Sequence, residues 1–232
     1  MLFRSVGGRV RTALVDGYRL DRGFQILLAA YPEVQRVLDL DALDLRAFAP
    51  GAVVRAGDRS WTVADPRREP GTIIDTVRAP IGSPIDKARL LALVRTATKG
   101  TVPELLRTPD SSTREYLASR GFSSTMIERF WRPLFAGIQL DPDLDVSARR
   151  FLLILRMLAT GDAVVPARGM GAIPEQLAAA LPEGAVELGV RVDALLGTTV
   201  RTVDGSSIEA EAVVIATDGP AATRLLDLPD PG

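Results

Sequence analysis

A pair of glycines followed by two arginines and a threonine is the first run with chemical potential: Gly7-Gly8-Arg9-Val10-Arg11-Thr12. Adjacent glycines let the backbone approach an anion closely and take positive φ. Successive N–H groups in such a turn form a concave anion site. The forked guanidinium groups of Arg9 and Arg11 suit phosphate, and Thr12 adds a hydroxyl. On these residues alone, a phosphate-binding loop and a plain Gly-Gly turn with surface arginines both stay open.

A second glycine-rich run, Gly169-Met170-Gly171-Ala172-Ile173-Pro174, comes near the spacing of a dinucleotide-binding fingerprint. Pro174 stands where the third glycine is needed, and the apolar segment before the run is short for the usual strand. The run therefore favours a structural turn that leads into a helix.

Two other clusters have competing interpretations. Phe130, Trp131 and Phe135 could line a substrate cavity, but aromatic residues at helical spacing more often form core. Three aspartates within residues 141–145 could hold a cation, but the segment lacks the glycine and the terminal glutamate of a calcium loop. We expect core in the first case and a solvated turn in the second, and we predict no metal site.

The composition excludes several classes of function. The chain of 232 residues carries 28 basic and 29 acidic side chains, so its net charge of −1 gives no reason to expect a nucleic-acid partner. It has no cysteine and no histidine, which excludes disulfides, thiolate nucleophiles and the commonest general base. The longest apolar run, residues 151–155, is far too short to cross a bilayer. We expect a cytoplasmic protein, and peripheral membrane contact stays open.

The elements that must position these residues alternate between strand and helix at both ends and are helical in the middle. Ser112 with Glu115 and Thr125 with Glu128 have capping-box spacing. This order of elements predicts one discontinuous α/β domain with an inserted helical lobe. We expect the chain to pass from the domain into the lobe near residue 40 and back near residue 165. The expected helices are 30–40, 86–98, 112–121, a helix from 125 that Pro133 kinks or ends, 148–160 capped by Ser147, 174–181 starting at Pro174, and a helix through 226 capped by Asp218. The expected strands are 52–56, 60–64, 186–188, 190–196, 199–203, 207–210 and 212–216, with a tight turn at 204–205.

After the glycine pair the chain continues Val15-Asp16-Gly17-Tyr18-Arg19-Leu20-Asp21-Arg22-Gly23-Phe24-Gln25. With this segment it resembles the flavin-containing amine oxidase superfamily, which includes phytoene desaturase-like and protoporphyrinogen oxidase-like enzymes. The resemblance implies that Gly7, Gly8 and Arg9, with Arg11 and Thr12, bind the FAD pyrophosphate. It implies that Gly23, Phe24 and Gln25 border the isoalloxazine ring.

The resemblance extends over nearly the whole chain. One similar segment is the core of the family's substrate domain, which corresponds to Phe130-Trp131-Arg132-Pro133-Leu134-Phe135-Ala136-Gly137-Ile138. Another is the segment where the chain returns from the substrate domain to the FAD domain, which corresponds to Pro166-Ala167-Arg168-Gly169-Met170-Gly171. Val192 in Val190-Arg191-Val192 corresponds to the valine at the adenine. Ala216 and Thr217 end Val213-Val214-Ile215-Ala216-Thr217, which is similar to the strand under the dinucleotide. The shared order of these motifs strengthens each of them.

The sequence also departs from the family pattern. The fingerprint G-x-G-x-x-G between a first strand and helix is not present, nor is the acidic residue that bonds the ribose. A Gly-Asp motif beside the ribityl chain is also missing before the last residues, Pro229-Asp230-Pro231-Gly232. Leu2-Phe3-Arg4-Ser5 reads like a translated sequencing adapter, and Ser5 takes the place of a family arginine. We therefore expect an internal fragment of a longer enzyme that binds FAD weakly or not at all by itself.

By resemblance, the fold is a partial FAD-binding Rossmann-like domain of the GR2 type, formed by residues 1–40 and 166–232, with a substrate-binding lobe at 41–165. The implied parent enzyme is an FAD-dependent oxidoreductase that oxidises or desaturates a C–N or C–C bond of a small apolar or amine substrate. No catalytic side chain is assigned. A non-catalytic binding or scaffold protein and a flavin-dependent isomerase remain alternatives.

Overall fold

The computed structural model describes residues 5–65 and 68–229 of the chain. Leu2, Phe3 and Arg4, on which the adapter interpretation rests, lie outside the described residues, as do the last three residues. The described chain divides into two compact units. The second unit is Gln25–Ala167, and the first takes the described residues on either side of it. The assignment of 1–40 and 166–232 to FAD binding and of 41–165 to substrate binding stays a prediction.

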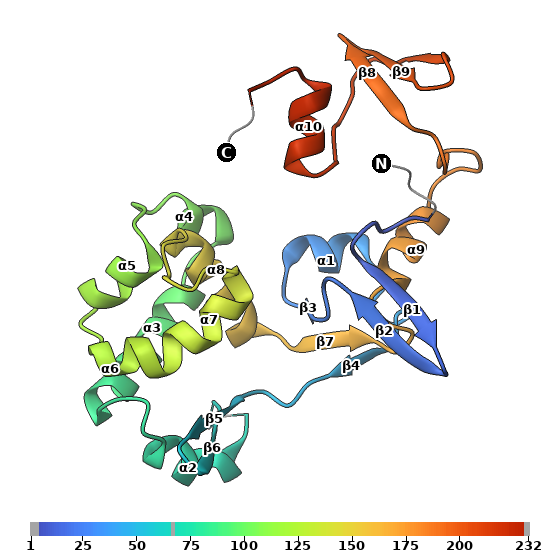
Figure 1. Cartoon of the computed structure of the whole chain (residues 1–232). Coiled ribbons are helices and arrows are strands. Elements are labelled where there is room, and N and C mark those ends of the chain that lie inside the picture. The colour runs from blue at the N-terminus through green and yellow to red at the C-terminus, as the bar shows by residue number, and fades with distance from the viewer. Residues whose placement is uncertain (1–4, 66–67, 230–232) are drawn as a thin grey trace. The chain divides into compact units, whose positions relative to one another are not determined.

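The first unit combines two antiparallel sheets with two helices (Figure 1). Its hairpin turns at Asp16-Gly17, where φ is +51° and +83°, the backbone that an Asp-Gly pair favours in a two-residue turn. The second sheet has three strands in the order β10-β9-β8. Asp218 caps the helix that follows it by accepting the Ala221 N–H, as expected. The elements of this unit are β1 Arg11–Val15, β2 Tyr18–Arg22, α9 Ala172–Ala179, β8 Val192–Leu196, β9 Thr199–Thr202, β10 Ser207–Glu209 and α10 Gly219–Leu225.

Two predicted strands of this unit, 186–188 and 212–216, are wrong as strands: both segments lack regular structure. Residues Val213–Thr217 still alternate between half-buried and exposed side chains, the period of an extended chain. No strand among the described residues pairs with them, so no ladder forms. The strand pairs described in the chain are all antiparallel, and the Rossmann-like arrangement stays a prediction.

The second unit begins with short strands, continues into a bundle of helices and closes with one more strand. The predicted hairpin over 52–56 and 60–64 is confirmed, with the ladder running from Ala52↔Val63 to Ala56↔Arg59. A three-stranded sheet has the order β3-β7-β4. The elements before the bundle, together with the closing strand, are β3 Leu27–Leu28, α1 Pro32–Val37, β4 Leu45–Ala47, β5 Ala52–Ala56, β6 Arg59–Val63, η1 Pro70–Thr72, α2 Ile73–Arg78 and β7 Ala163–Pro166.

Side-chain caps fix where the helices of the bundle begin. Ser112 and Glu115 form the predicted capping box, and Ser147 caps the long apolar helix that ends at Gly161, also as expected. Further capping boxes, at Ser83 and Thr101, begin two other helices. The helices of the bundle are α3 Pro84–Thr98, α4 Val102–Leu106, α5 Thr113–Ser119, α6 Ser124–Met126, the π-helical η2 Ile127–Trp131, α7 Arg132–Gln139 and α8 Ala148–Thr160.

Two predicted helix starts are wrong in detail, and at Pro133 the helix is disturbed and not ended. Ser123, not Thr125, caps the helix before Trp131, because its hydroxyl accepts the Met126 N–H at 3.2 Å. Pro133 does not end that helix but disturbs it: the chain stays helical from α6 through η2 into α7, and the π-helical turn Ile127–Trp131 lies directly before the proline, which has no N–H to donate. Pro174 lies in the first turn of α9, which begins two residues earlier at Ala172.

The core of the second unit is built around aromatic rings. Trp131 and Phe135 are 1% and 0% exposed, and the rings of Phe135 and Phe151 have centroids 4.5 Å apart. Phe130 is half-buried, with its ring centroid 5.1 Å from that of Trp131. The core interpretation of Trp131 and Phe135 is therefore confirmed. In the described part of the chain, we find no helix with the length and apolarity that a membrane crossing requires.

Candidate functional site

The Gly7-Gly8 turn lies near the start of the first unit, and its two glycines have different structural roles. The Val10 N–H donates to the Gly7 carbonyl at 2.8 Å and closes the turn. Gly7 has φ +90°, and a Cβ there would lie 2.3 Å from the Val10 carbonyl oxygen and 2.6 Å from Pro174 Cγ. Gly8, at φ +54°, faces open space, with nothing within 4 Å of a Cβ. Gly7 is required by packing, whereas Gly8 leaves exposed main chain that a ligand could approach.

The side chain of Thr12 has a structural task. Its hydroxyl donates to Asp21 Oδ1 at 2.5 Å and accepts the Gly171 N–H at 2.9 Å. The same Asp21 oxygen accepts the Met170 N–H at 2.9 Å. Thr12 and Asp21 face each other in the β1–β2 ladder. These bonds join the hairpin to the segment that begins α9, about 150 residues later, as the separations of 149 and 159 show.

Positions 169 and 171 require glycine because Thr12 packs directly against both of them. A Cβ on Gly169, where φ is +89°, would lie 2.4 Å from Thr12 Oγ1, and one on Gly171 would lie 3.0 Å from the Thr12 nitrogen. The Ala172 N–H donates to the Gly169 carbonyl at 3.1 Å, which closes a turn just before α9. The interpretation of this run as a structural turn is confirmed.

The segment predicted to border the flavin ring spans the boundary between the units. Gly23 has φ +90°, and a Cβ there would lie 2.6 Å from the Arg9 carbonyl oxygen, so Gly23 packs on the residue that follows the glycine pair. Phe24 is 64% exposed. Gln25, also exposed, is the first residue of the second unit. Their role at a flavin stays a prediction.

A pocket of about 520 Å³ lies between the strands β8 and β9, the extended segment 213–217 and the helix α10. Three predicted cofactor residues, Val192, Ala216 and Thr217, line it together. Val192 is the first residue of β8, and the register shifts between it and Ala194. Such bulges bend a strand and often lie beside sites. Residues distant in sequence thus meet at one cavity.

The pocket carries unbalanced positive charge, which sequence reasoning missed. Arg191 and Arg224 both line it. Its acidic residue, Asp193, is paired with Arg201 at 3.2 Å. The two lining guanidinium groups therefore have no carboxylate partner from the pocket wall, and a phosphate is a fitting counter-ion. The arginine of Val190-Arg191-Val192 was visible as a motif, but only the fold brings Arg224 to it.

Asp21 is a further residue that sequence reasoning did not single out. The signal was available in the Val15-Asp16-Gly17 hairpin, because a two-residue turn at 16–17 pairs residue 12 with residue 21. Its importance depends on the Met170 contact, which no local pattern contains.

The aspartates of residues 141–145 form a turn, as expected. The Asp141 carboxylate accepts the N–H groups of Asp143 at 3.1 Å and of Val146 at 2.7 Å. These hydrogen bonds, the one from Val146 first, lower the pKa of Asp141. No group of three or more metal-ligating acidic side chains lies close together in the described residues.

The glycine turn and the arginine-lined pocket belong to one unit. The sequence matches the family of flavin-containing amine oxidoreductases over residues 4–231. A search of curated proteins gave no match. Among solved structures, a protein provisionally assigned as a protoporphyrinogen oxidase from Exiguobacterium sp. 255-15 shares 18% identity and a TM-score of 0.59, over 97% of this chain and 54% of that one.

Two more solved structures have the same fold. A double mutant of putrescine oxidase shares 19% identity and a TM-score of 0.63, over 97% of this chain and 53% of that one. Reduced UDP-galactopyranose mutase shares 14% identity and a TM-score of 0.55, over 97% and 50% of the two chains. The chain thus spans about half the length of the structures it matches. On the match that covers nearly all of its residues, the chain belongs to the family of flavin-containing amine oxidoreductases.

Proposed function

We propose that the protein is an FAD-dependent oxidoreductase that oxidises or desaturates a C–N or C–C bond of a largely apolar or amine substrate. One observation carries the proposal beyond family membership. A single compact unit holds a glycine turn with open main chain at Gly8 and a pocket where Val192, Ala216 and Thr217 meet two arginines without acidic partners in its wall. An elongated anionic dinucleotide is the ligand that such features fit.

In this proposal, Gly7, Gly8, Arg9 and Arg11 hold the pyrophosphate through main-chain N–H groups and guanidinium forks. Thr12 supports the same site indirectly, because its hydroxyl is used to bind Asp21 and Gly171.

The adenosine end of the dinucleotide is assigned to the arginine-lined pocket, through Val192, Ala216 and Thr217. Gly23, Phe24 and Gln25 are assigned to the isoalloxazine end. Residues 1–40 and 166–232 would then form the FAD-binding part, and residues 41–165 would bind substrate.

The bound flavin would supply the acceptor for the two electrons removed from the substrate. The chain contains neither histidine nor cysteine, so its own contribution is to orient the substrate and to set the polarity around the cofactor. The likeness to putrescine oxidase supports an amine as the first substrate class to examine, and the likeness to the protein assigned as a protoporphyrinogen oxidase supports an apolar ring system as the second.

The test uses the protein as its gene encodes it in the source genome. We expect purification to yield a yellow protein that releases FAD, not FMN, on denaturation. Anaerobic addition of an amine should bleach the flavin absorbance, and product analysis would separate oxidation from isomerisation.

Two variants connect the test to the site. The Arg191→Gln, Arg224→Gln double variant should bind FAD at least roughly tenfold more weakly, whereas Arg55→Gln, at an exposed position of β5 in the other unit, should keep the wild-type affinity. A colourless natural protein that neither contains nor takes up FAD would refute the proposal.

A further inference from the structure

A pocket of about 590 Å³ lies wholly within the second unit, Gln25–Ala167, which is the helical unit of the chain. The helices α3, α4, α5 and α8 surround it. Known small-molecule sites span about 300–1,000 Å³ and are mainly apolar with a few polar groups. This pocket fits that description, since aliphatic side chains and one tyrosine form much of its wall. They are Ala97, Leu105, Pro109, Tyr116, Ala148 and Leu152.

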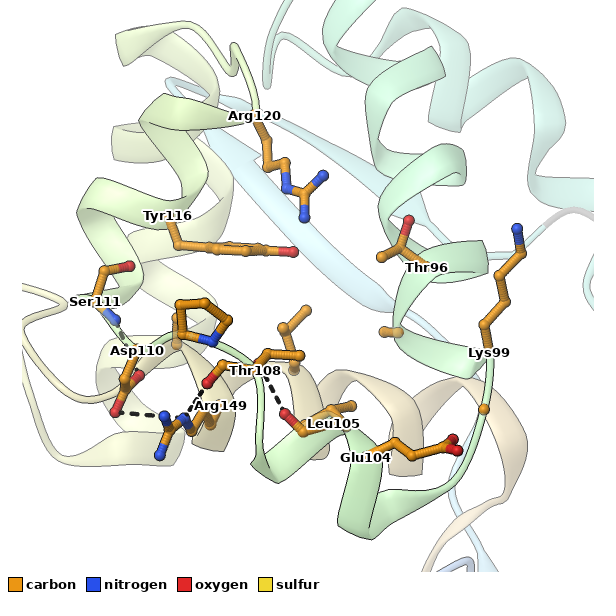
Figure 2. Close-up of a pocket in the computed structure, with 15 residues that line it drawn as sticks. Thr96, Lys99, Glu104, Leu105, Thr108, Asp110, Ser111, Tyr116, Arg120 and Arg149 are labelled. Atoms are coloured by element: carbon orange, nitrogen blue, oxygen red, sulfur yellow. Dashed lines mark hydrogen bonds and ion pairs between the residues drawn. The ribbon is translucent and has the colours of Figure 1, made fainter.

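Tyr116 presents an unused donor at this pocket. Its hydroxyl is shielded from water and has no hydrogen-bond partner within the described chain. Figure 2 shows the hydroxyl directed across the pocket towards Thr96 of α3. The Thr96 hydroxyl is already used, because it donates to the Ala92 carbonyl at 3.0 Å. A shielded hydroxyl without a partner is costly to a fold and is satisfied when a ligand brings an acceptor.

Arg120 provides the charge beside this hydroxyl. Its Cζ lies 4.9 Å from the centroid of the Tyr116 ring, and Figure 2 shows the guanidinium above the ring plane. Arg120 is the exposed C-cap residue of α5 and forms no ion pair within the described residues. Its side chain can therefore move to admit a ligand without breaking a salt bridge.

The acids that line the pocket are already engaged. Glu104 accepts the Thr101 N–H at 2.7 Å in a capping box. Asp110 accepts the Ser147 hydroxyl at 2.8 Å and lies 4.0 Å from Arg149. Neither carboxylate pairs with Arg120, and Lys99, which also lines the pocket, forms no ion pair in the described residues. The pocket therefore keeps two cations and a phenolic donor above an apolar floor.

We infer that this pocket binds a small carboxylate with an apolar tail. The carboxylate accepts hydrogen bonds from the Tyr116 hydroxyl and the Arg120 guanidinium, and the tail packs on Ala97, Leu105 and Leu152. The inference does not depend on flavin binding, because every residue in it belongs to the second unit.

Isothermal titration of the 232-residue chain with octanoate tests the inference, with octanol and octylamine as probes of equal length. Octanoate should bind, and the other two should bind at least roughly tenfold more weakly, since each lacks the charged acceptor. Tyr116→Phe should weaken octanoate binding about fivefold, and Arg120→Gln roughly tenfold. Arg95→Gln, an exposed arginine of α3 outside the pocket, should leave affinity unchanged.

The free Tyr116→Phe protein should melt no lower than the wild type, because it loses only a hydroxyl without a partner. This makes a loss of binding in that variant distinguishable from unfolding. Equal affinity for octanol and octanoate, no binding of octanoate, or equal octanoate affinity in wild type, Tyr116→Phe and Arg120→Gln would each overturn the inference. The titration contains no flavin, so failure of the proposed oxidoreductase function would not alter its result.

Discussion

The Thr12 hydroxyl and the Asp21 carboxylate meet across the β1–β2 hairpin at 2.5 Å, and both also accept main-chain N–H groups from the Met170-Gly171 segment. The hairpin that follows the glycine turn is thereby fastened to the start of α9. The proposed pyrophosphate loop therefore owes its position to residues from both ends of the chain.

Replacing Asp21 with alanine should destabilise the first unit. The change leaves the Met170 N–H and the Thr12 hydroxyl without their acceptor, which should cost about 1–3 kcal/mol. Urea unfolding followed by far-UV circular dichroism measures the loss. Arg19→Ala, on an exposed position of the same strand, should change the free energy of unfolding by less than about 0.5 kcal/mol. Equal stability of the two variants would show that the Asp21 contacts contribute nothing.

The two glycines of the turn should respond differently to alanine. Gly7→Ala combines φ +90° with a 2.3 Å contact to backbone, so it should cost about 2 kcal/mol or more of stability. Gly8→Ala meets open space but still places a Cβ on left-handed backbone at φ +54°, so it should cost about 1–2 kcal/mol, less than Gly7→Ala. In the natural protein, Gly8→Ala should nevertheless lower FAD affinity, because a methyl group would then cover the exposed main chain. Unchanged FAD affinity would remove Gly8 from the proposed site.

The arginine-lined pocket should give salt-dependent binding. In the natural protein, ADP-ribose, which carries a pyrophosphate without a flavin, should compete with FAD and should bind more weakly as the salt concentration rises. The Arg191→Gln, Arg224→Gln double variant should lower its affinity roughly tenfold and flatten the salt dependence. Fluorescence competition titrations would measure both, and a salt-insensitive affinity would contradict the assignment.

Asp86 should make the helical unit sensitive to acid. Its side chain is 0% exposed, and burial by itself raises the pKa. Hydrogen bonds from the N–H groups and hydroxyls of Ser123 and Ser83 outweigh burial and lower the pKa of Asp86 from 3.8 to about 2. Since the folded pKa is depressed, the stabilisation is present above pH 3.8 and is lost as the pH falls towards 2. Its size is about 2 kcal/mol.

Measuring the free energy of unfolding between pH 7 and pH 2 would check this for wild type and Asp86→Asn. The difference between the two should shrink as the pH falls through this window. Asp58→Asn, in an exposed hairpin turn, serves as the control and should follow the wild-type curve. A constant difference at all pH values would mean that the loss comes from packing and not from the charge.

The sequence predicted those features that depend on near neighbours. The cap at Ser112, the cap at Ser147 and the hairpin around Gly57 all follow from residues within a few positions, and the structure has them. The structural turn before α9 also followed from the substitution of Pro174 for a fingerprint glycine. Local hydrogen bonds decide these features, so a local pattern suffices.

Features that require a distant partner could not be derived in this way. Val213–Ala216 has the residues of a strand, but a strand needs a neighbour, and the described residues supply none. The π-helical turn Ile127–Trp131 lies before Pro133, where the sequence predicted a kink or an end, but the packing of the Trp131 ring against Phe122 and Phe151 depends on distant residues. The presence of Arg191 and Arg224 in the wall of one pocket likewise depends on tertiary structure.

Both tryptophans of the chain, Trp61 and Trp131, lie in the second unit, and Trp131 is enclosed by aromatic rings. Intrinsic tryptophan emission is consequently an optical probe of the helical unit alone. The first unit contains one tyrosine, Tyr18, and no tryptophan, so it contributes nothing to tryptophan emission. An emission signal that persists under denaturant would therefore carry no information about the residues around Gly7 and Val192.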